Sequence, residues 1–193
     1  MEKKIDSLVE ARLPTKFGNF KLVAFPGDSK DKENLALIMG EIEDKLLVRI
    51  HSECFTGDVL HSMRCDCGEQ LDLAMQKISK EGSGIIVYLR QEGRGIGLVN
   101  KLKAYNLQDE GMDTVEANIA LGFNAELRDY SNASNILRTL GIEKIRLLTN
   151  NPSKVEELEK DGFIVEQVTH KTEVNKENRD YLETKASKMN HKL

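Results

Sequence analysis

Three cysteines, the whole complement of the chain, stand close together in the sequence and could hold a metal ion. They are Cys54, Cys65 and Cys67, with the spacing C-x10-C-x-C. Three thiolates suit Zn²⁺, which is borderline soft and prefers tetrahedral sulfur and nitrogen ligands. An odd number of cysteines does not fit a disulfide framework, and in a reducing compartment clustered cysteines are usually metal ligands or catalytic groups. The cysteines are therefore candidate ligands of a zinc ion.

The fourth position of such a site decides what the metal can do. A histidine, His51 or His61, would close the site and make the zinc structural. A water molecule would leave it open, and zinc with cysteine ligands can activate that water for attack on a purine or pyrimidine ring. Glu53, directly before Cys54, could accept the proton that the water loses. Buried cysteines without a metal are a third alternative, and the spacing alone leaves all three open.

A glycine-rich segment with two arginines could bind an anion. Residues 90–97 read RQEGRGIG, between a continuous apolar run and an expected helix. Its glycines allow a sharp turn and the close approach of a ligand. Arg90 and Arg94 place positive charge at the end of a strand, where ligands of α/β sheets bind, and the next helix N-terminus would favour a phosphate. The segment lacks the GK[ST] of a P-loop, so a plain tight turn is the alternative.

A second loop has the same placement. The expected strand 145–149 ends in TNNPSK, which leads into another helix. Lys154 lies in the first turn of that helix, where a cation is unfavourable for the helix dipole. Its position therefore indicates an anionic ligand, and a solvent-exposed surface lysine is the alternative.

The residues before these motifs form the first elements of the fold. Apolar runs at 20–25, 35–42 and 46–50 predict three strands, with a hairpin between the second and the third. The polar stretch GDSKDKEN at 27–34 predicts an exposed loop.

From Glu69 onward, expected helices and strands alternate. Apolar residues recur every three or four positions up to Lys80, and GIIVYL at 84–89 reads as a buried strand. The alternation predicts an α/β fold, a three-layer α/β/α arrangement with a mixed β-sheet and a strand-rich N-terminal third. We expect one domain over 1–193, with 178–193 as a C-terminal helix and tail. The other expected elements are helices over 98–105, 114–121 (capped by Asp113), 152–162 and 178–189, a helix capped by Ser131 and ending at Leu140, and strands over 145–149 and 163–168.

The composition is that of an ordinary globular protein, with 39% hydrophobic and 31% charged residues. Lys and Arg number 28 and Asp and Glu number 32, so the net charge is −4. This argues against a protein that coats DNA, which usually has a strongly basic domain, but it permits a local basic pocket. No apolar run approaches the roughly 20 residues of a membrane helix, and the charged segment 1–13 lacks a signal-peptide core. We therefore expect a cytoplasmic protein with no nucleic-acid or membrane partner.

Five segments, taken together and in order, resemble one family. RIHSECFTGD with SMRCDCGEQL, YLRQEGRGIGL, LQDEGMDTVEAN and RLLTNNPSK are similar to GTP cyclohydrolase II of riboflavin biosynthesis, from about residue 13 onward. The resemblance implies that GTP and three waters give formate, pyrophosphate and 2,5-diamino-6-(5-phospho-D-ribosylamino)pyrimidin-4(3H)-one. It also implies one Zn²⁺ per chain, whose activated water opens the imidazole ring at C8, Mg²⁺ at the triphosphate, and a homodimer.

The same resemblance implies roles for individual residues. Cys54, Cys65 and Cys67 match the zinc ligands. Tyr105 matches a tyrosine associated with ring opening, and Arg128 matches an arginine proposed to attack the α-phosphorus and release pyrophosphate. The other matches are contacts to GTP: Arg49, Ile50, His51, Ser52, Glu53, Gln70, Glu92, Gly93, Arg94, Thr114, Thr149 and Lys154.

One position departs from the family pattern. The family usually reads D-E-R-D before and after that arginine, whereas this chain reads E-L-R-D. Glu126 stands where the family's proton acceptor is an aspartate, and its extra methylene moves the carboxylate by roughly 1.5 Å. A misplacement of ~1 Å can cost on the order of 10²-fold in rate. Two alternatives to a full GTP cyclohydrolase II follow: a catalytically weak GTP-binding paralog with a structural zinc, and a variant that stops at the formamidopyrimidine after ring opening.

Overall fold

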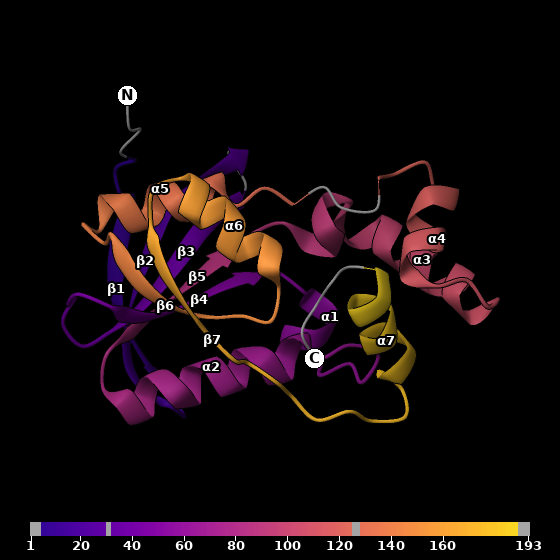
Figure 1. The fold of residues 1–193 in the computed structure, drawn as a ribbon, viewed down its shortest axis with the longest axis horizontal. Coiled ribbons are helices and arrows are strands. Elements are labelled where there is room, and N and C mark those ends of the chain that lie inside the picture. The colour runs from indigo at the N-terminus through magenta and orange to yellow at the C-terminus, as the bar shows by residue number, and fades with distance from the viewer. Residues whose placement is uncertain (1–4, 30–31, 125–127, 189–193) are drawn as a thin grey trace.

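A mixed sheet of seven strands forms the centre of the molecule (Figure 1). The computed structural model describes residues 5–29, 32–124 and 128–188. Its strands are β1 (Val9–Thr15), β2 (Gly18–Ser29), β3 (Lys32–Met39), β4 (Leu46–Ser52), β5 (Gly84–Leu89), β6 (Lys144–Leu148) and β7 (Ile164–Val168). Their order in the sheet is β1-β2-β3-β5-β4-β6-β7. The pairs from β1 to β5 are antiparallel, and the pairs from β5 to β7 are parallel.

Helices cover both faces of this sheet. α5 (Ser131–Thr139) and α6 (Pro152–Lys160) lie on one face, and α2 (Cys67–Glu81) lies on the other (Figure 1). The predicted α/β fold and its three-layer arrangement with a mixed sheet are therefore confirmed.

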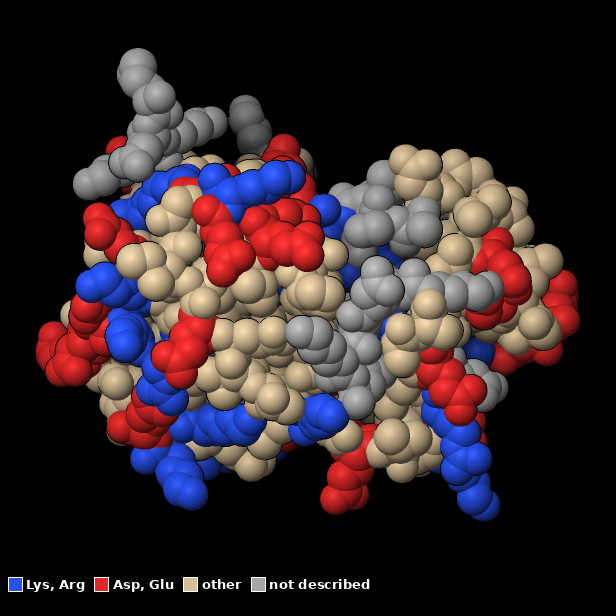
Figure 2. Space-filling model, in the orientation of Figure 1, with Lys and Arg blue, Asp and Glu red and all other residues tan. Residues whose placement is uncertain are grey.

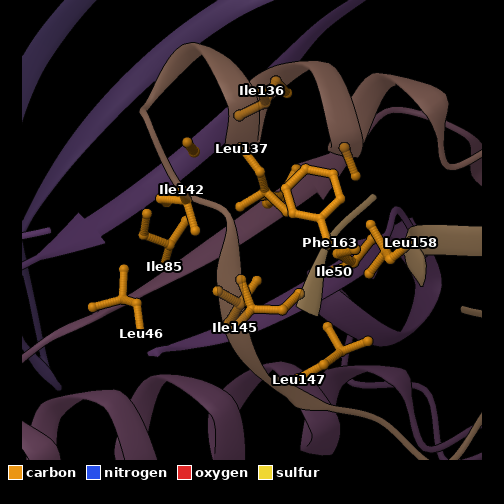
Figure 3. Packing of buried hydrophobic residues seen from close by; sticks show 14 of the residues in the cluster. Leu46, Ile50, Ile85, Ile136, Leu137, Ile142, Ile145, Leu147, Leu158 and Phe163 are labelled. Atoms are coloured by element: carbon orange, nitrogen blue, oxygen red, sulfur yellow. The ribbon is translucent and has the colours of Figure 1, made fainter. Parts of the chain in front are cut away.

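Alternate residues of β4 divide between two hydrophobic cores. Val48 and Ile50 lie with Leu137 of α5 and Leu158 of α6 in the larger core, and all four are fully buried. Figure 3 shows Ile50 with Leu137 and Leu158. Leu47 packs on the opposite face, against α2. Because side chains alternate along a strand, β4 is held on both faces and carries its last residues to a well-defined place.

The remaining helices lie beyond the carboxyl ends of β4 and β5 (Figure 1). α1 (Phe55–Asp58) follows β4, and the 3-10 turn η1 (Glu92–Gly95) and α3 (Gly97–Asp109) follow β5. α4 (Thr114–Ala120) packs on α3, and α7 (Arg179–Lys188) packs on α4. Within the described ranges, none of the helices combines the length and the apolar character needed to cross a bilayer.

The predicted hairpin between the runs 35–42 and 46–50 is wrong. β5 lies between β3 and β4, antiparallel to the former and parallel to the latter. All of its residues except Tyr88 are buried. Such an apolar strand is stable in an inner position of the sheet, covered on both faces. The hairpin joins β2 and β3 instead.

Two further details of the N-terminal region differ from the expectation. Both strands of the β2–β3 hairpin extend into the predicted loop 27–34, with a register shift between Phe25 and Ser29. β1 is not predicted at all, because VEARLPT forms an edge strand whose residues are mostly exposed. Val9, Ala11 and Leu13 do alternate with polar residues, but the pattern is short and is followed by Pro14, which is unusual inside a strand.

Capping side chains explain where two helices begin. Asp113 caps α4 as predicted: its carboxylate accepts hydrogen bonds from the N–H groups of Val115 and Glu116. The prediction that Ser131 is an N-cap is wrong, because Ser131 is the first residue of α5. Its N–H and hydroxyl both donate to the carboxylate of Asp129, which organises the turn before the helix.

Candidate active site

The end of β4 presents polar side chains to the face that α2 covers. Since Val48 and Ile50 face the other core, Arg49 and His51 face α2. Arg49 is 6% exposed, and it donates to the backbone oxygen of Leu148 over 2.9 Å and to Oε1 of Gln70. Burial lowers the pKa of Arg49 to about 10. The guanidinium therefore stays charged at neutral pH inside the protein.

The three cysteine sulfurs meet where α1 and α2 begin. Cys54 precedes α1, Cys65 lies in the turn before α2, and Cys67 is the first residue of α2. Their sulfur atoms all lie within 4.8 Å of one another, and those of Cys54 and Cys65 are 3.7 Å apart. Tetrahedral Zn–S bonds of about 2.3 Å would place the sulfurs about 3.8 Å apart. The cluster therefore fits a zinc ion.

Two glycines, because they have no side chain, make room for the three cysteine sulfurs to come together. A Cβ on Gly57 would lie 2.9 Å from Sγ of Cys65 and 3.2 Å from Sγ of Cys54. A Cβ on Gly68 would lie 2.3 Å from the backbone oxygen of Gly57. Any side chain at these positions would separate the starts of α1 and α2, so both glycines are needed for the sulfurs to converge.

Asp58 holds the first cysteine in place. Its carboxylate accepts hydrogen bonds from the N–H of Cys54 over 3.0 Å and from the hydroxyl of Tyr88 over 2.8 Å. Nε2 of His51 lies 3.0 Å from the same carboxylate, and the imidazole stacks on the ring of Tyr88. Only 3% of the Asp58 side chain is exposed. This buried network fixes the backbone from which Cys54 projects.

Among the described residues, the candidate metal-binding cluster consists of the three cysteines and includes no histidine. His51 directs Nε2 to Asp58 rather than to the sulfurs, and burial lowers its pKa, which favours the neutral ring. His61 is exposed. A zinc ion bound here would therefore have three protein ligands. Its fourth coordination position would be left for a water molecule or a substrate from the cavity that the cysteines line.

Mutual contact shifts the acidity of the three thiols. The pKa of Cys54 is lowered, because the thiols of Cys65 and Cys67 donate hydrogen bonds to its thiolate. The same contact with Cys54 raises the pKa of Cys65 to about 11. Nζ of Lys101 donates to Sγ of Cys54 over 3.0 Å and to Oε1 of Glu92 over 2.8 Å. One ammonium thus offsets negative charge on both the cysteine cluster and the glycine-rich turn.

A cavity of about 510 Å³ opens beside the cysteines, which is the size of a small-molecule site. Tyr105 of α3 lies in its wall, with its hydroxyl 3.2 Å from Oγ1 of Thr56. The guanidinium of Arg64 lies over the Tyr105 ring, 4.6 Å from its centroid. Glu53, also in the wall, forms an ion pair with Arg90 at 3.1 Å.

A smaller cavity of about 60 Å³ adjoins the first and is rich in cations. Lys154 lies in its wall and is 5% exposed, which overturns the alternative of a solvent-exposed lysine. Its Nζ donates to the backbone oxygen of Ile50 over 2.8 Å. The cationic side chains of this cavity are Arg49, Arg94, Arg128, Lys154 and Lys185. So many positive groups around so small a space favour an anionic ligand.

The glycine-rich turn is strained where it meets both cavities. Gly93 and Arg94 adopt left-handed backbone angles, with φ of 62° and 60°, and for arginine this conformation is uncommon. Glu92 stabilises the turn by accepting hydrogen bonds from the N–H groups of Gly93 and Phe55, each over 2.6 Å. Nη1 of Arg94 and Nε of Arg49 are buried and have no hydrogen-bond partner within the described ranges. Buried donors of this kind indicate an acceptor supplied by a ligand.

Most of the residues expected in the site do line these two cavities. Ser52, Cys67, Arg94 and Arg128 line both of them. The larger cavity adds Glu53, Cys54, Cys65, Glu92, Gly93, Tyr105 and Thr114. The smaller cavity adds Arg49, His51, Gln70, Thr149 and Lys154.

One expected residue, Ile50, does not direct its side chain to the cavities. The side chain of Ile50 is fully buried in the larger core, on the opposite face of β4, and only its backbone oxygen reaches Lys154. Glu126 lies outside the described residues. The amide of Gln70, expected to contact the nucleotide, is held between Arg49 and Asp66.

Sequence reasoning missed several residues that shape the site. Asp58 and Asp66 stand inside the cysteine segment, and a carboxylate so near cysteines could have been noticed. Lys101 belongs to α3, and Tyr181 and Lys185 belong to α7. Nothing in the local sequence of these two helices links them to the cysteines, because the contacts span large separations along the chain.

The chain is similar to proteins of one described family over most of its length. The sequence model of the GTP cyclohydrolase II family matches residues 6–170. GTP cyclohydrolase-2 of Histophilus somni (strain 2336) is 53% identical over 191 residues, which cover 97% of this chain and 88% of that protein. GTP cyclohydrolase-2 of Pasteurella multocida (strain Pm70) is 53% identical over 192 residues, with the same coverage. GTP cyclohydrolase-2 of Haemophilus influenzae (strain PittGG) is 51% identical over 192 residues, covering 97% and 89%.

Proposed function

Because the chain belongs to the GTP cyclohydrolase II family, a family of hydrolases, we propose that it hydrolyses GTP in the first step of riboflavin biosynthesis. The products would be formate, pyrophosphate and 2,5-diamino-6-(5-phospho-D-ribosylamino)pyrimidin-4(3H)-one. The observation that carries the proposal is the junction of two cavities, one beside three thiols and one rich in cations, which share Cys67, Arg94 and Arg128. One GTP molecule needs such neighbouring sites, for its purine ring and for its triphosphate.

The cysteine end of the site serves ring opening. Cys54, Cys65 and Cys67 would hold zinc, which when bound supplies a Lewis acid that activates water for attack on the purine. Glu53 lines the cavity next to Cys54 and takes up the proton that this water loses. Tyr105 lines the same cavity, where its hydroxyl can contact the opening ring.

The cationic end serves the triphosphate. Arg94 and Lys154 bind phosphate oxygens, and Mg²⁺ accompanies the nucleotide, as triphosphate chemistry usually requires. Arg128 lines both cavities, so it can reach the α-phosphate between the sugar and the leaving pyrophosphate. Its guanidinium stabilises charge on that phosphate, or it attacks the phosphorus once Glu126 has taken its proton. We also propose a homodimer, which light scattering on the purified protein would test.

One incubation tests the reaction. The protein is mixed with GTP, Mg²⁺ and Zn²⁺, and formate, pyrophosphate and the ultraviolet spectrum of the product are measured separately. All three signals are expected. A ring-opened product that keeps its formyl group would instead support the truncated reaction, and binding of GTP without turnover would support the inactive paralog.

A matched pair of variants tests the metal. Cys65→Ser is expected to lose bound zinc and formate release together. Met63→Ala, at an exposed position of the same loop, is expected to keep both. Formate release by a zinc-free Cys65→Ser protein would contradict the proposed role of the cluster.

A further inference from the structure

The C-terminal helix α7 reaches the site, although it lies beyond residue 170, where the match to the family's sequence model ends. Tyr181 lines both cavities, and Lys185 lines the smaller one. Nζ of Lys185 lies over the ring of Tyr181, 4.4 Å from its centroid. Only 9% of the Lys185 side chain is exposed. A lysine is seldom buried to this degree unless it is paired.

A chain of hydrogen bonds connects Lys185 with the end of β4. Nζ of Lys185 donates to Oδ1 of Asp66 over 2.5 Å. Nε2 of Gln70 donates to Oδ2 of Asp66 over 2.6 Å. Arg49 in turn donates to Oε1 of Gln70. The Asp66 carboxylate therefore determines which way the Gln70 amide faces, and the amide oxygen then orients the Arg49 guanidinium.

The charge of Asp66 needs this lysine. The Asp66 side chain is 1% exposed, and the Lys185 ammonium, 2.5 Å from its Oδ1, is its ion-pair partner. Without the ammonium, an uncompensated buried carboxylate would remain beside Gln70, close to a cavity that collects positive charge. Such a carboxylate would repel an anion and would draw Arg49 toward itself.

We propose that Lys185 is a positioning residue for the anionic part of the substrate: it neutralises Asp66 and, through Gln70, holds Arg49 in the wall of the smaller cavity. The proposal rests on the proposed function, since it takes the anion to be the triphosphate of GTP. The C-terminal helix is then part of the nucleotide site and not merely a support for α4. On the face drawn in Figure 2, basic and acidic side chains of the described residues are interspersed, and they form no wide basic patch there.

The test replaces the ammonium and keeps the apolar stem. Lys185→Met is expected to raise the KM for GTP and the Kd for inorganic pyrophosphate by about tenfold or more, because one partner of a buried charge pair is removed. Zinc content should not change, and Lys185→Arg should restore most of the affinity. The matched control is Lys16→Met, which removes an exposed ion pair with Asp72 of helix α2 and should leave both constants unchanged.

A double variant separates positioning from direct contact with the anion. Asp66→Asn combined with Lys185→Met removes both charges and keeps an acceptor for Gln70, so pyrophosphate affinity should return to within about threefold of wild type. If the double variant binds as weakly as Lys185→Met, the lysine does not act through Asp66 and the proposal is wrong. It is equally overturned if Lys185→Met lowers only the melting temperature. If the pyrophosphate affinity depends on Lys185 and Asp66 as expected but the wild-type protein releases no formate from GTP, the proposed function is refuted and this inference is not.

Discussion

The ammonium of Lys101 donates a hydrogen bond to the thiol sulfur of Cys54 over 3.0 Å. Its other partner, Glu92, holds the glycine-rich turn. A zinc ion held by three thiolates would combine two positive with three negative charges, and the adjacent ammonium would make that assembly neutral. The contact joins the cysteine cluster to the turn that carries Arg94.

Removal of this ammonium should weaken metal binding. Lys101→Met is expected to lower zinc affinity by about 10- to 100-fold, the usual effect of losing a hydrogen-bond partner of a metal ligand. Lys103→Met, at an exposed position of the same helix, is the control. Competition with a chelating dye measures both variants, and equal zinc affinities would show that Lys101 does not support the site.

A methyl group at Gly57 should disrupt the metal site by contact alone. The added Cβ would lie 2.9 Å from Sγ of Cys65, closer than atoms normally pack. Gly57→Ala is expected to lose zinc and activity together. Gly141→Ala provides the control, because nothing lies within 4 Å of its added Cβ although its φ is +77°. That variant should lose some stability and keep full zinc content, as measured by elemental analysis of the purified proteins.

The two side chains proposed to bind phosphate, those of Arg94 and Lys154, should matter more for binding of the nucleotide than of the nucleoside. Arg94→Ala and Lys154→Ala are each expected to weaken GTP binding by about tenfold, since each removes a charge-assisted contact in a shielded cavity. Guanosine binding should change little. Titration calorimetry with both ligands checks this, and equal losses for the two would mean that neither side chain contacts the phosphates.

Arg128 should be needed for turnover and not for metal binding. Arg128→Ala is expected to abolish formate and pyrophosphate release, because the side chain lines both cavities while the three sulfurs remain in place. Zinc content should stay at the wild-type level. Loss of zinc in this variant would point to a folding defect instead of a catalytic one.

Variants of Glu126 test whether its carboxylate accepts the proton of Arg128. Glu126→Gln should lower the rate strongly, and Glu126→Asp should keep or improve it by restoring the shorter side chain of the family pattern. Full activity of Glu126→Gln would show that this residue takes no proton from Arg128.

A buried histidine should make stability depend on pH. His170 is fully buried, and its Nε2 donates to the backbone oxygen of Gln70 over 2.8 Å. Burial, with a smaller effect from Arg49, lowers the pKa of His170 to about 2, whereas an unfolded histidine has a pKa of about 6.5. Between pH 6.5 and pH 2, His170 is therefore protonated in the unfolded chain and neutral in the folded chain. This contribution to stability is complete above pH 6.5 and is lost as the pH falls toward 2.

Urea denaturation measures the effect. Between pH 7.5 and pH 5, the free energy of unfolding should fall by about 2 kcal/mol more in the wild type than in His170→Gln. The glutamine keeps a donor for Gln70 and does not titrate. Identical pH dependence in the two proteins would mean that His170 is protonated in the folded state.

Local sequence patterns determined much of the site. The spacing of Cys54, Cys65 and Cys67 predicted a metal cluster, and the sulfurs do converge. The glycine-rich turn and Lys154 were both expected to face an anion, and both lie at a cavity lined with cations. These predictions succeeded because side-chain chemistry and the starts and ends of helices depend on residues only a few positions apart.

Tertiary structure alone decided the order of the sheet and the partners of the site. β5 lies between β3 and β4 because an apolar strand is most stable where both faces are covered, and no turn residue marks that insertion. Lys101 meets Cys54 across 47 positions and Lys185 meets Asp66 across 119 positions. Contacts at such separations form only when the chain has closed large loops. They leave no periodic or local signal in the sequence.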